Sequence, residues 1–202
     1  MGKVKMGNKF FIEQLVGKYC DIADKGTVVV IDTETTGLSN DDDVVQIAVL
    51  VAKQRKELFS KAVYLKNQVP INGTAAQEVN GLTDEFLAKE GMEPKVVLQD
   101  LLNLINSCID NHEEVLIVGH NIGFDVRMLN NMFQRYELDL FPRRVLFCDT
   151  KQFVGALNLP KSVLPNNRLC SCEQYLHLEG TNSHDALDDV KLCYELFTFL
   201  TT

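Results

Sequence analysis

A run of β-branched and apolar residues ends in two acids, and this combination limits how the chain can fold. Residues 27–33 read TVVVIDT and are followed by Glu34, so Asp32 and Glu34 stand two residues apart. Such a run is typical of a strand that is buried on both faces. Side chains two apart on a strand point to the same face. The sequence therefore predicts a buried strand with a pair of carboxylates at its C-terminal end, where ligands collect in open α/β sheets. The alternative is that the strand simply ends there and both acids are solvated.

The remaining patterns predict an α/β domain. Further strands are expected at 44–52, 58–65, 115–119 and 145–148, and helices at 8–24, 94–110, 124–136, 150–157 and 185–199, with short helices within 75–90 and 171–177. Three strands in succession, followed by alternating helices and strands, predict a mixed sheet covered by helices on both faces. We divide the chain into an N-terminal helical extension, residues 1–26, and one domain, residues 27–202.

Composition restricts the class of partner. The chain has 202 residues, of which 46% are hydrophobic, and this is enough for one sizeable core. Its net charge of -8 argues against broad electrostatic binding of long duplex nucleic acid. The charge does not argue against an enzyme that holds a short strand end through metal ions, because bound cations are often the largest local charges in a site.

The cysteines and the apolar stretches bear on location. The 6 cysteines form no CxxC pair, which favours reduced, mostly buried thiols. No basic segment with a following apolar run marks a signal peptide, and no apolar stretch reaches the length of a membrane span. We therefore expect a cytoplasmic protein.

Two later segments add acids that can join the first pair. Asp125 follows the strand predicted at 115–119 through the loop of HNIGFD, and the segment SHDALDDV places Asp185, Asp188 and Asp189 beside His184. An acid near a helix start is also explained by the helix dipole and the free N–H groups there. Periodicity alone does not choose between Asp188 and Asp189.

Together these segments predict one reactive site. Carboxylates that converge in a fold repel each other, so they either take up protons or bind cations. A histidine beside them supplies a proton acceptor near neutral pH. Carboxylates that hold two hard metal ions, together with a base, are suited to the cleavage of phosphodiesters by water.

The three segments resemble the motifs of the DEDDh, or DnaQ-like, branch of the 3′–5′ exonucleases. IDTETTGL is similar to the first motif, GHNIGFD to the second, and HDALDD to the third, which the family writes as His-x-Ala-x-x-Asp. This pattern selects His184 and Asp189. The resemblance extends from about residue 27 to residue 200. It implies a ribonuclease-H-like fold with a mixed five-stranded sheet and a likeness to the epsilon subunit of DNA polymerase III.

The resemblance also implies a mechanism, substrates and partners. Two Mg²⁺ or Mn²⁺ ions would be held by Asp32, Glu34, Asp125 and Asp189, and His184 would take a proton from the attacking water. The substrate would be the 3′ end of single-stranded DNA or RNA, the products nucleoside 5′-monophosphates, and a DNA polymerase a further partner. The residues expected to contact the terminal nucleotide are Thr35, Gly37, Leu38, Asn80, Asn121 and Phe124.

One position departs from the pattern of the proofreading relatives. The segment VNGLTDEFL at 79–87 resembles their Val-His-Gly-Ile, but Asn80 stands in place of the histidine. Asparagine can donate and accept hydrogen bonds but carries no charge. We expect catalysis to survive this change and the contact with the terminal nucleotide to differ.

Two other functions are weighed against the nuclease. A non-catalytic nucleic-acid-binding or polymerase-binding module of the same fold would be expected to lack one of the acids, and none is missing. A phosphotransferase with Asp32 as its nucleophile would leave the segment HDALDD without a role.

Overall fold

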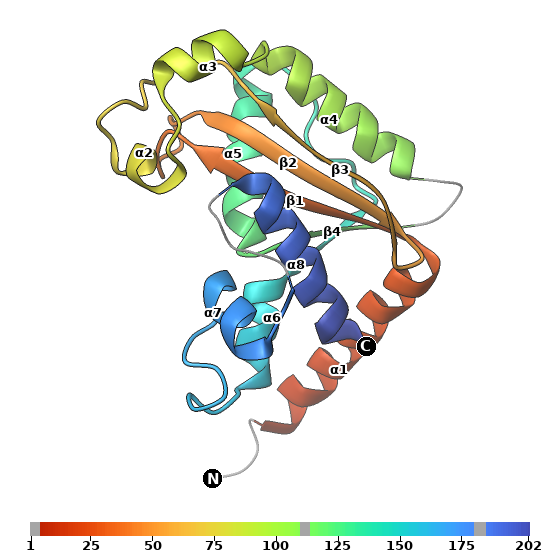
Figure 1. The fold of residues 1–202 in the computed structure, drawn as a ribbon. Helices are drawn as coiled ribbons and strands as arrows, with labels where there is room; N and C mark the ends of the chain where they lie inside the picture. The colour runs from red at the N-terminus through yellow and green to blue at the C-terminus, as the bar shows by residue number, and fades with distance from the viewer. Residues whose placement is uncertain (1–4, 110–113, 180–184) are drawn as a thin grey trace.

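The computed structural model describes residues 5–109, 114–179 and 185–202, with side chains described from residue 15 onward. Its centre is one sheet of five strands in the order β3-β2-β1-β4-β5 (Figure 1). The strands are β1 (Thr27–Thr35), β2 (Val44–Lys53), β3 (Lys56–Tyr64), β4 (Val115–Gly119) and β5 (Val145–Asp149). β1 pairs antiparallel with β2 and parallel with β4, so the predicted mixed five-stranded sheet is confirmed.

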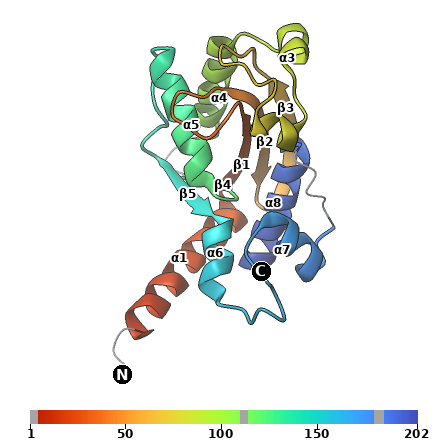
Figure 2. The same ribbon diagram turned by 90° about the vertical axis from the view of Figure 1, so that its left-hand side faces the viewer.

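Helices cover both faces of this sheet, as the alternation of strands and helices predicted. The helices of the described residues are α1 (Lys5–Lys25), α2 (Ala75–Asn80), α3 (Asp84–Glu90), α4 (Pro94–Cys108), α5 (Ile122–Arg135), α6 (Thr150–Leu157), α7 (Leu169–Leu176) and α8 (Ala186–Thr201). α4 and α5 lie on one side of the sheet and α8 lies on the other (Figure 2).

The alternation of side chains along β1 decides which residues face which layer. Val29 and Ile31 pack with residues of α4 and α5, whereas Val28 and Val30 pack with residues of α1 and α8. Because successive side chains of a strand point to opposite faces, Asp32 continues the face toward α8. Thr33 continues the face toward α5. The side chains of Asp32 and Glu34 are therefore on the face toward α8, and the side chain of Thr33 is on the face toward α5.

Two boundaries near the acids differ from those predicted. β1 continues two residues further, to Thr35, because Glu34 still pairs with Gln46 of β2 and Thr35 with Val44 across a register shift. α5 begins at Ile122, before the predicted start at residue 124, directly after Asn121 in the left-handed conformation (φ 76°). Asp125 thus lies in the first turn of α5.

The segment between β3 and α4 makes an excursion toward the C-terminal end of β1. Leu65 and Met92 form a bridge where the chain leaves and returns, with hydrogen bonds from Lys66 N to Met92 O (3.0 Å) and from Met92 N to Tyr64 O (2.9 Å). α2 and α3 lie within this excursion, and the arrowhead of β1 points toward α2 in Figure 1. The segment is thereby placed beside the end of the strand that carries the two acids.

Candidate active site

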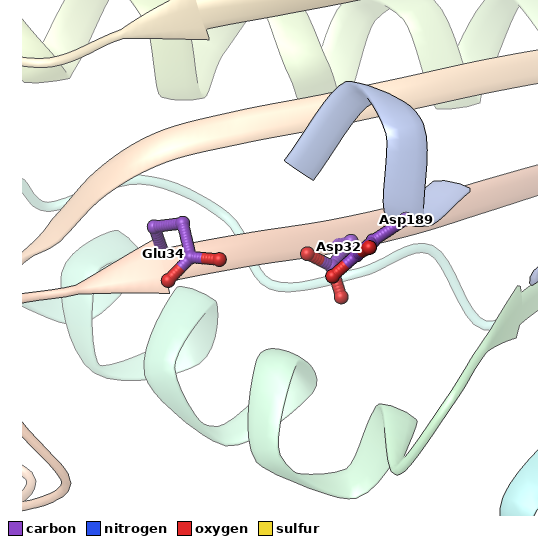
Figure 3. A group of neighbouring side chains, drawn as sticks. All are labelled: Asp32, Glu34 and Asp189. Atoms are coloured by element: carbon purple, nitrogen blue, oxygen red, sulfur yellow. The ribbon is translucent and has the colours of Figure 1, made fainter. Parts of the chain in front are cut away.

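Three carboxylates from β1 and α8 form a cluster at the C-terminal end of β1. One ligand oxygen of each of Asp32, Glu34 and Asp189 lies within 4.8 Å of the others. Figure 3 shows Asp32 beside Asp189, with Glu34 further along the same strand. Two segments that are far apart in the sequence are thus brought together by the packing of α8 on β1.

The first turn of α8 settles which acid of the third segment faces the cluster. Asp189 is 7% exposed and lies in the cluster, whereas Asp188 is half-buried and is not a member of it. Asp185 is the N-cap of α8, where its carboxylate accepts a hydrogen bond from Leu187 N (2.9 Å). Asp189, the acid that the family pattern selected, thus lies in the cluster, and its role as a metal ligand stays a prediction.

Asp125 approaches the cluster from the opposite layer. β4 pairs with β1 only from Thr27 to Val30, so the edge of β1 beyond Val30 is open on that side. The carboxylate of Asp125 lies at this open edge, where its Oδ1 accepts hydrogen bonds from Thr33 N (3.0 Å) and Thr33 Oγ1 (2.7 Å). The charge of Asp125 also raises the pKa of Asp32, which places the two carboxylates within electrostatic reach.

Burial and mutual repulsion both act on the carboxylates of the cluster. Burial raises the pKa of Asp32 well above its usual value, and the neighbouring carboxylates of Asp125, Asp189 and Glu34 add to this. Burial raises the pKa of Glu34 to about 7, against the opposing effect of a hydrogen bond with Asn80. Burial likewise raises the pKa of Asp125 to about 7, although its hydrogen bonds with Thr33 act in the other direction. Crowded carboxylates with these properties fit a hard divalent cation, which prefers oxygen ligands.

The metal-free protein should lose stability as the pH rises from about 6.5 to about 8.0. Glu34 and Asp125 have pKa values of about 7 in the fold, but their usual values in an unfolded chain are about 4. In this range only the folded state still binds these protons, so raising the pH favours unfolding by about 1 kcal/mol for each carboxyl. The measurement is thermal unfolding in EDTA across this range.

A divalent ion should remove this pH dependence, because it binds the folded state and offsets the charges. The range starts near pH 6.5 because of His120. Burial lowers the pKa of His120 to about 4, whereas the ordinary pKa of histidine is about 6.5. Between these two values His120 makes stability rise with pH, which would mask the effect of the carboxyls. A stability in EDTA that stays constant or rises over the range would contradict the electrostatic description of the cluster.

A pocket of about 400 Å³ adjoins Glu34 at the end of β1. It is lined by five of the residues predicted to contact a nucleotide, which are Thr35, Gly37, Leu38, Asn80 and Phe124. It is also lined by Thr33, Thr36, Thr74, Ala75, Ala76 and Val79, which sequence reasoning missed. Asn121 does not line this pocket. Its backbone N–H donates to Asp149 Oδ1 (3.0 Å) at the start of α5.

The turn after β1 is fixed by contacts that leave no room for a side chain at Gly37. A Cβ at this position would lie 2.4 Å from Asp42 Oδ2, the atom that accepts a hydrogen bond from Ser39 N (2.7 Å). Arg127 of α5 donates to Leu38 O (3.2 Å), and its guanidinium carbon lies 5.2 Å from the centre of the Phe124 ring. Leu38 itself is 77% exposed, so the turn presents an apolar side chain at the mouth of the pocket.

Asn80 is engaged with the strand that carries the acids. Its Nδ2 donates to Thr35 O (3.3 Å), and its Oδ1 accepts from Leu82 N (3.1 Å). A hydrogen bond from Asn80 also lowers the pKa of Glu34. The residue that departs from the histidine of the proofreading relatives thus contacts the end of β1 as well as the pocket.

Of the two histidines considered in this region, the structure describes one. His184 lies outside the described residues. His120 has both ring nitrogens in hydrogen bonds, Nδ1 with Thr150 Oγ1 (3.0 Å) and Nε2 with Asn167 O (2.9 Å). These contacts connect the end of β4 to α6 and to the segment before α7, so His120 has a structural role.

The comparisons with known proteins agree with this architecture. The model of the exonuclease family RNase_T matches residues 29–197 of this chain. The chain belongs to the RNase_T exonuclease family. The predicted kinship to 3′–5′ exonucleases is thereby confirmed, and the chain is an enzyme of this class.

Relatives of this RNase_T member include a DNA exonuclease and DNA polymerase III proteins. The chain is 30% identical over 181 residues to the 3′-5′ DNA exonuclease Cap18 of Escherichia coli, covering 88% of this chain and 92% of that protein. It is 27% identical to the DNA polymerase III subunit epsilon of Treponema pallidum, covering 83% of this chain and 73% of that subunit. It is 24% identical to a PolC-type DNA polymerase III of Caldanaerobacter subterraneus, but it spans only 11% of that polymerase.

Solved structures show the same fold. E. coli Exonuclease I, crystallised in complex with a dT13 oligonucleotide, matches with a TM-score of 0.75 at 19% identity. The match covers 88% of this chain and 41% of Exonuclease I. The ribonuclease-H-like fold expected from the sequence is confirmed. No helix within the described residues is long and apolar enough to cross a membrane.

Proposed function

We propose that this RNase_T member removes nucleotides from the 3′ end of single-stranded DNA by hydrolysis and releases nucleoside 5′-monophosphates. The observation that carries the proposal is the cluster formed by the buried Asp189 and the half-buried Asp32 and Glu34, beside a pocket that could accept a strand terminus. Asp125, bound to the edge of β1 through Thr33, is the fourth acid of the set.

These four carboxylates would hold two Mg²⁺ or Mn²⁺ ions, directly or through water. Their oxygens suit either ion, and the raised pKa values of Asp32, Glu34 and Asp125 are what crowded acids without a bound cation should show. When bound, two such ions polarise the scissile phosphate and stabilise charge on the leaving oxygen. The residues of this chain contribute the fixed arrangement of acids, because β1 supplies two of them on one face and α8 and α5 bring the others to it.

His184 would accept the proton of the attacking water. It is the histidine of the His-x-Ala-x-x-Asp pattern, five residues before Asp189. An imidazole titrates near neutral pH and is therefore suited to general base catalysis at the pH of a cell. His120 is less suited, because its ring nitrogens are engaged and burial lowers its pKa to about 4.

The pocket beside Glu34 would receive the terminal nucleotide. Leu38 and Phe124 offer apolar surface for a base, and Gly37 contributes to the wall of the pocket. Asn80 and Thr35 are the polar residues of the pocket that we expect nearest to the sugar, and Asn121, outside the pocket lining, would contribute from the start of α5. A volume of about 400 Å³ lies in the range of small-molecule sites.

DNA is proposed over RNA because of the relatives. Cap18 is named a DNA exonuclease and matches this chain over nearly its whole length. Exonuclease I was crystallised with a DNA oligonucleotide. The epsilon and PolC-type relatives also support a DNA polymerase as a further partner. A cytoplasmic location and the division of the chain after residue 26 stay predictions.

The test is degradation of matched DNA and RNA oligomers that carry either a free or a blocked 3′ end. We expect stepwise shortening of single-stranded DNA with a free 3′ end in Mg²⁺ or Mn²⁺, and none in EDTA or with the blocked end. Faster degradation of the RNA oligomer would overturn the choice of DNA. Degradation of the 3′-blocked oligomer from its 5′ end would overturn the proposed polarity.

A further inference from the structure

Thr33 stands between the two acids of β1 but belongs to the opposite face of the sheet. Its backbone N–H and its hydroxyl both donate to one atom, Asp125 Oδ1, at 3.0 Å and 2.7 Å. Both residues are buried, with Thr33 7% and Asp125 4% exposed. The sequence separation is 92 residues, so this contact joins two acid-bearing segments that share no local connection.

The contact between Thr33 and Asp125 forms where the pairing of β4 with β1 has ended. The parallel pairing of β1 with β4 stops at Val30 and Val118, and β4 itself ends at Gly119. The N–H of Thr33 therefore meets no carbonyl of β4, and a buried N–H without a partner would be costly. The carboxylate of Asp125 takes the place of that carbonyl, and the hydroxyl of Thr33 adds a second donor.

Two donors on one oxygen restrict the rotation of the carboxylate. The Oδ1 atom of Asp125 is held against the backbone of β1, while Oδ2 takes no bond from Thr33. A side-chain carboxylate otherwise turns easily about its terminal torsion. The hydroxyl of Thr33 thus helps to fix which oxygen of Asp125 can face the cluster.

We infer that Thr33 is a positioning residue for the metal-binding carboxylate of Asp125, and that its hydroxyl raises the affinity of the site for a divalent ion. The inference rests on the proposed function, in which Asp125 is one of the four ligands. Residues that hydrogen-bond to metal ligands fix the orientation of those ligands, and their loss typically weakens metal binding about 10-fold to 100-fold.

The experiment compares Thr33→Val with Thr33→Ser. Valine keeps the shape and the backbone N–H but removes the hydroxyl, whereas serine keeps the hydroxyl. Titration with Mn²⁺ in a calorimeter, without nucleic acid, should show binding that is weaker by about tenfold in Thr33→Val. Binding in Thr33→Ser should stay close to that of the unchanged protein. Thr27→Val is the matched control, since Thr27 is a buried threonine at the other end of β1.

A second measurement shows whether Thr33 acts through Asp125. In the Asp125→Asn background, adding Thr33→Val should weaken Mn²⁺ binding no further, because the carboxylate that it positions is already gone. A further loss of the same size in that background would overturn the inference.

The outcomes separate the inference from the proposed function. If the unchanged protein binds no Mn²⁺, the proposed metal site fails. If the unchanged protein binds Mn²⁺ and Thr33→Val binds it equally well, only the role of Thr33 fails. If Thr33→Val does not fold, Thr33→Ala takes its place in the same comparison. Failure of both to fold while Thr33→Ser folds would also overturn the inference, since the hydroxyl would then be needed for the fold as a whole.

Discussion

The Asp32→Asn variant should lose exonuclease activity by about 1,000-fold or more, because metal ions contribute several kcal/mol of transition-state stabilisation. Asp32 lies at the centre of the cluster, since the carboxylates of Asp125, Asp189 and Glu34 all raise its pKa. Asparagine has the same size but no charge, so it should weaken the binding of both ions. The measurement is the initial rate on single-stranded DNA in Mg²⁺, together with Mn²⁺ affinity by calorimetry.

The same variant should fold at least as well as the unchanged protein when metal is absent. Removing one charge from a cluster of like charges relieves repulsion, so the melting temperature in EDTA should stay the same or rise. Asp188→Asn is the matched control, because it removes a charge from the same turn of α8 as Asp189 but outside the cluster. Undiminished hydrolysis by Asp32→Asn would end the proposal that this cluster is the active site.

The His184→Ala variant should lower the rate of hydrolysis by about 100-fold to 10,000-fold, the usual contribution of a general base. Its affinity for Mn²⁺ should change little, because we assign His184 to proton transfer and not to metal binding. The two measurements are the rate at saturating Mg²⁺ and the Mn²⁺ titration. The loss should be smaller at high pH, where hydroxide becomes more abundant and a protein base matters less.

His120→Gln provides the contrast for this experiment. His120 connects β4 with α6 and with the segment before α7. Its replacement should therefore lower the melting temperature and leave the rate of hydrolysis by the folded protein nearly unchanged. If His184→Ala lost metal affinity as strongly as Asp32→Asn, the assignment of His184 as the base would be wrong.

Many strands and helices of the fold could be predicted from the sequence, because the patterns that indicate them involve neighbouring residues. The β-branched run that begins at Thr27 and the apolar residues of β4 each predict a buried strand from neighbouring residues alone. Helical spacing left Asp188 and Asp189 equivalent, and the resemblance of the third motif to the family pattern selected Asp189, which the structure places in the cluster.

The parts that could not be predicted depend on contacts between distant segments. Nothing near Thr33 indicates that its hydroxyl will meet Asp125, because that meeting depends on where β4 ends. Ala76 likewise lies in no motif that marks it as a wall of the pocket. Its position depends on the course of the chain after β3, and no sequence pattern predicts that course.

The segment between β3 and α4 separates one wall of the pocket from the elements that carry the acids. The segment that supplies Asn80 and Val79 leaves the sheet at Leu65 and rejoins it at Met92, and these two residues are direct neighbours. The acids lie outside this segment, on β1, α5 and α8. Replacing the segment between Leu65 and Met92 should therefore change which 3′ ends the pocket binds. The acids on β1, α5 and α8 should keep their positions.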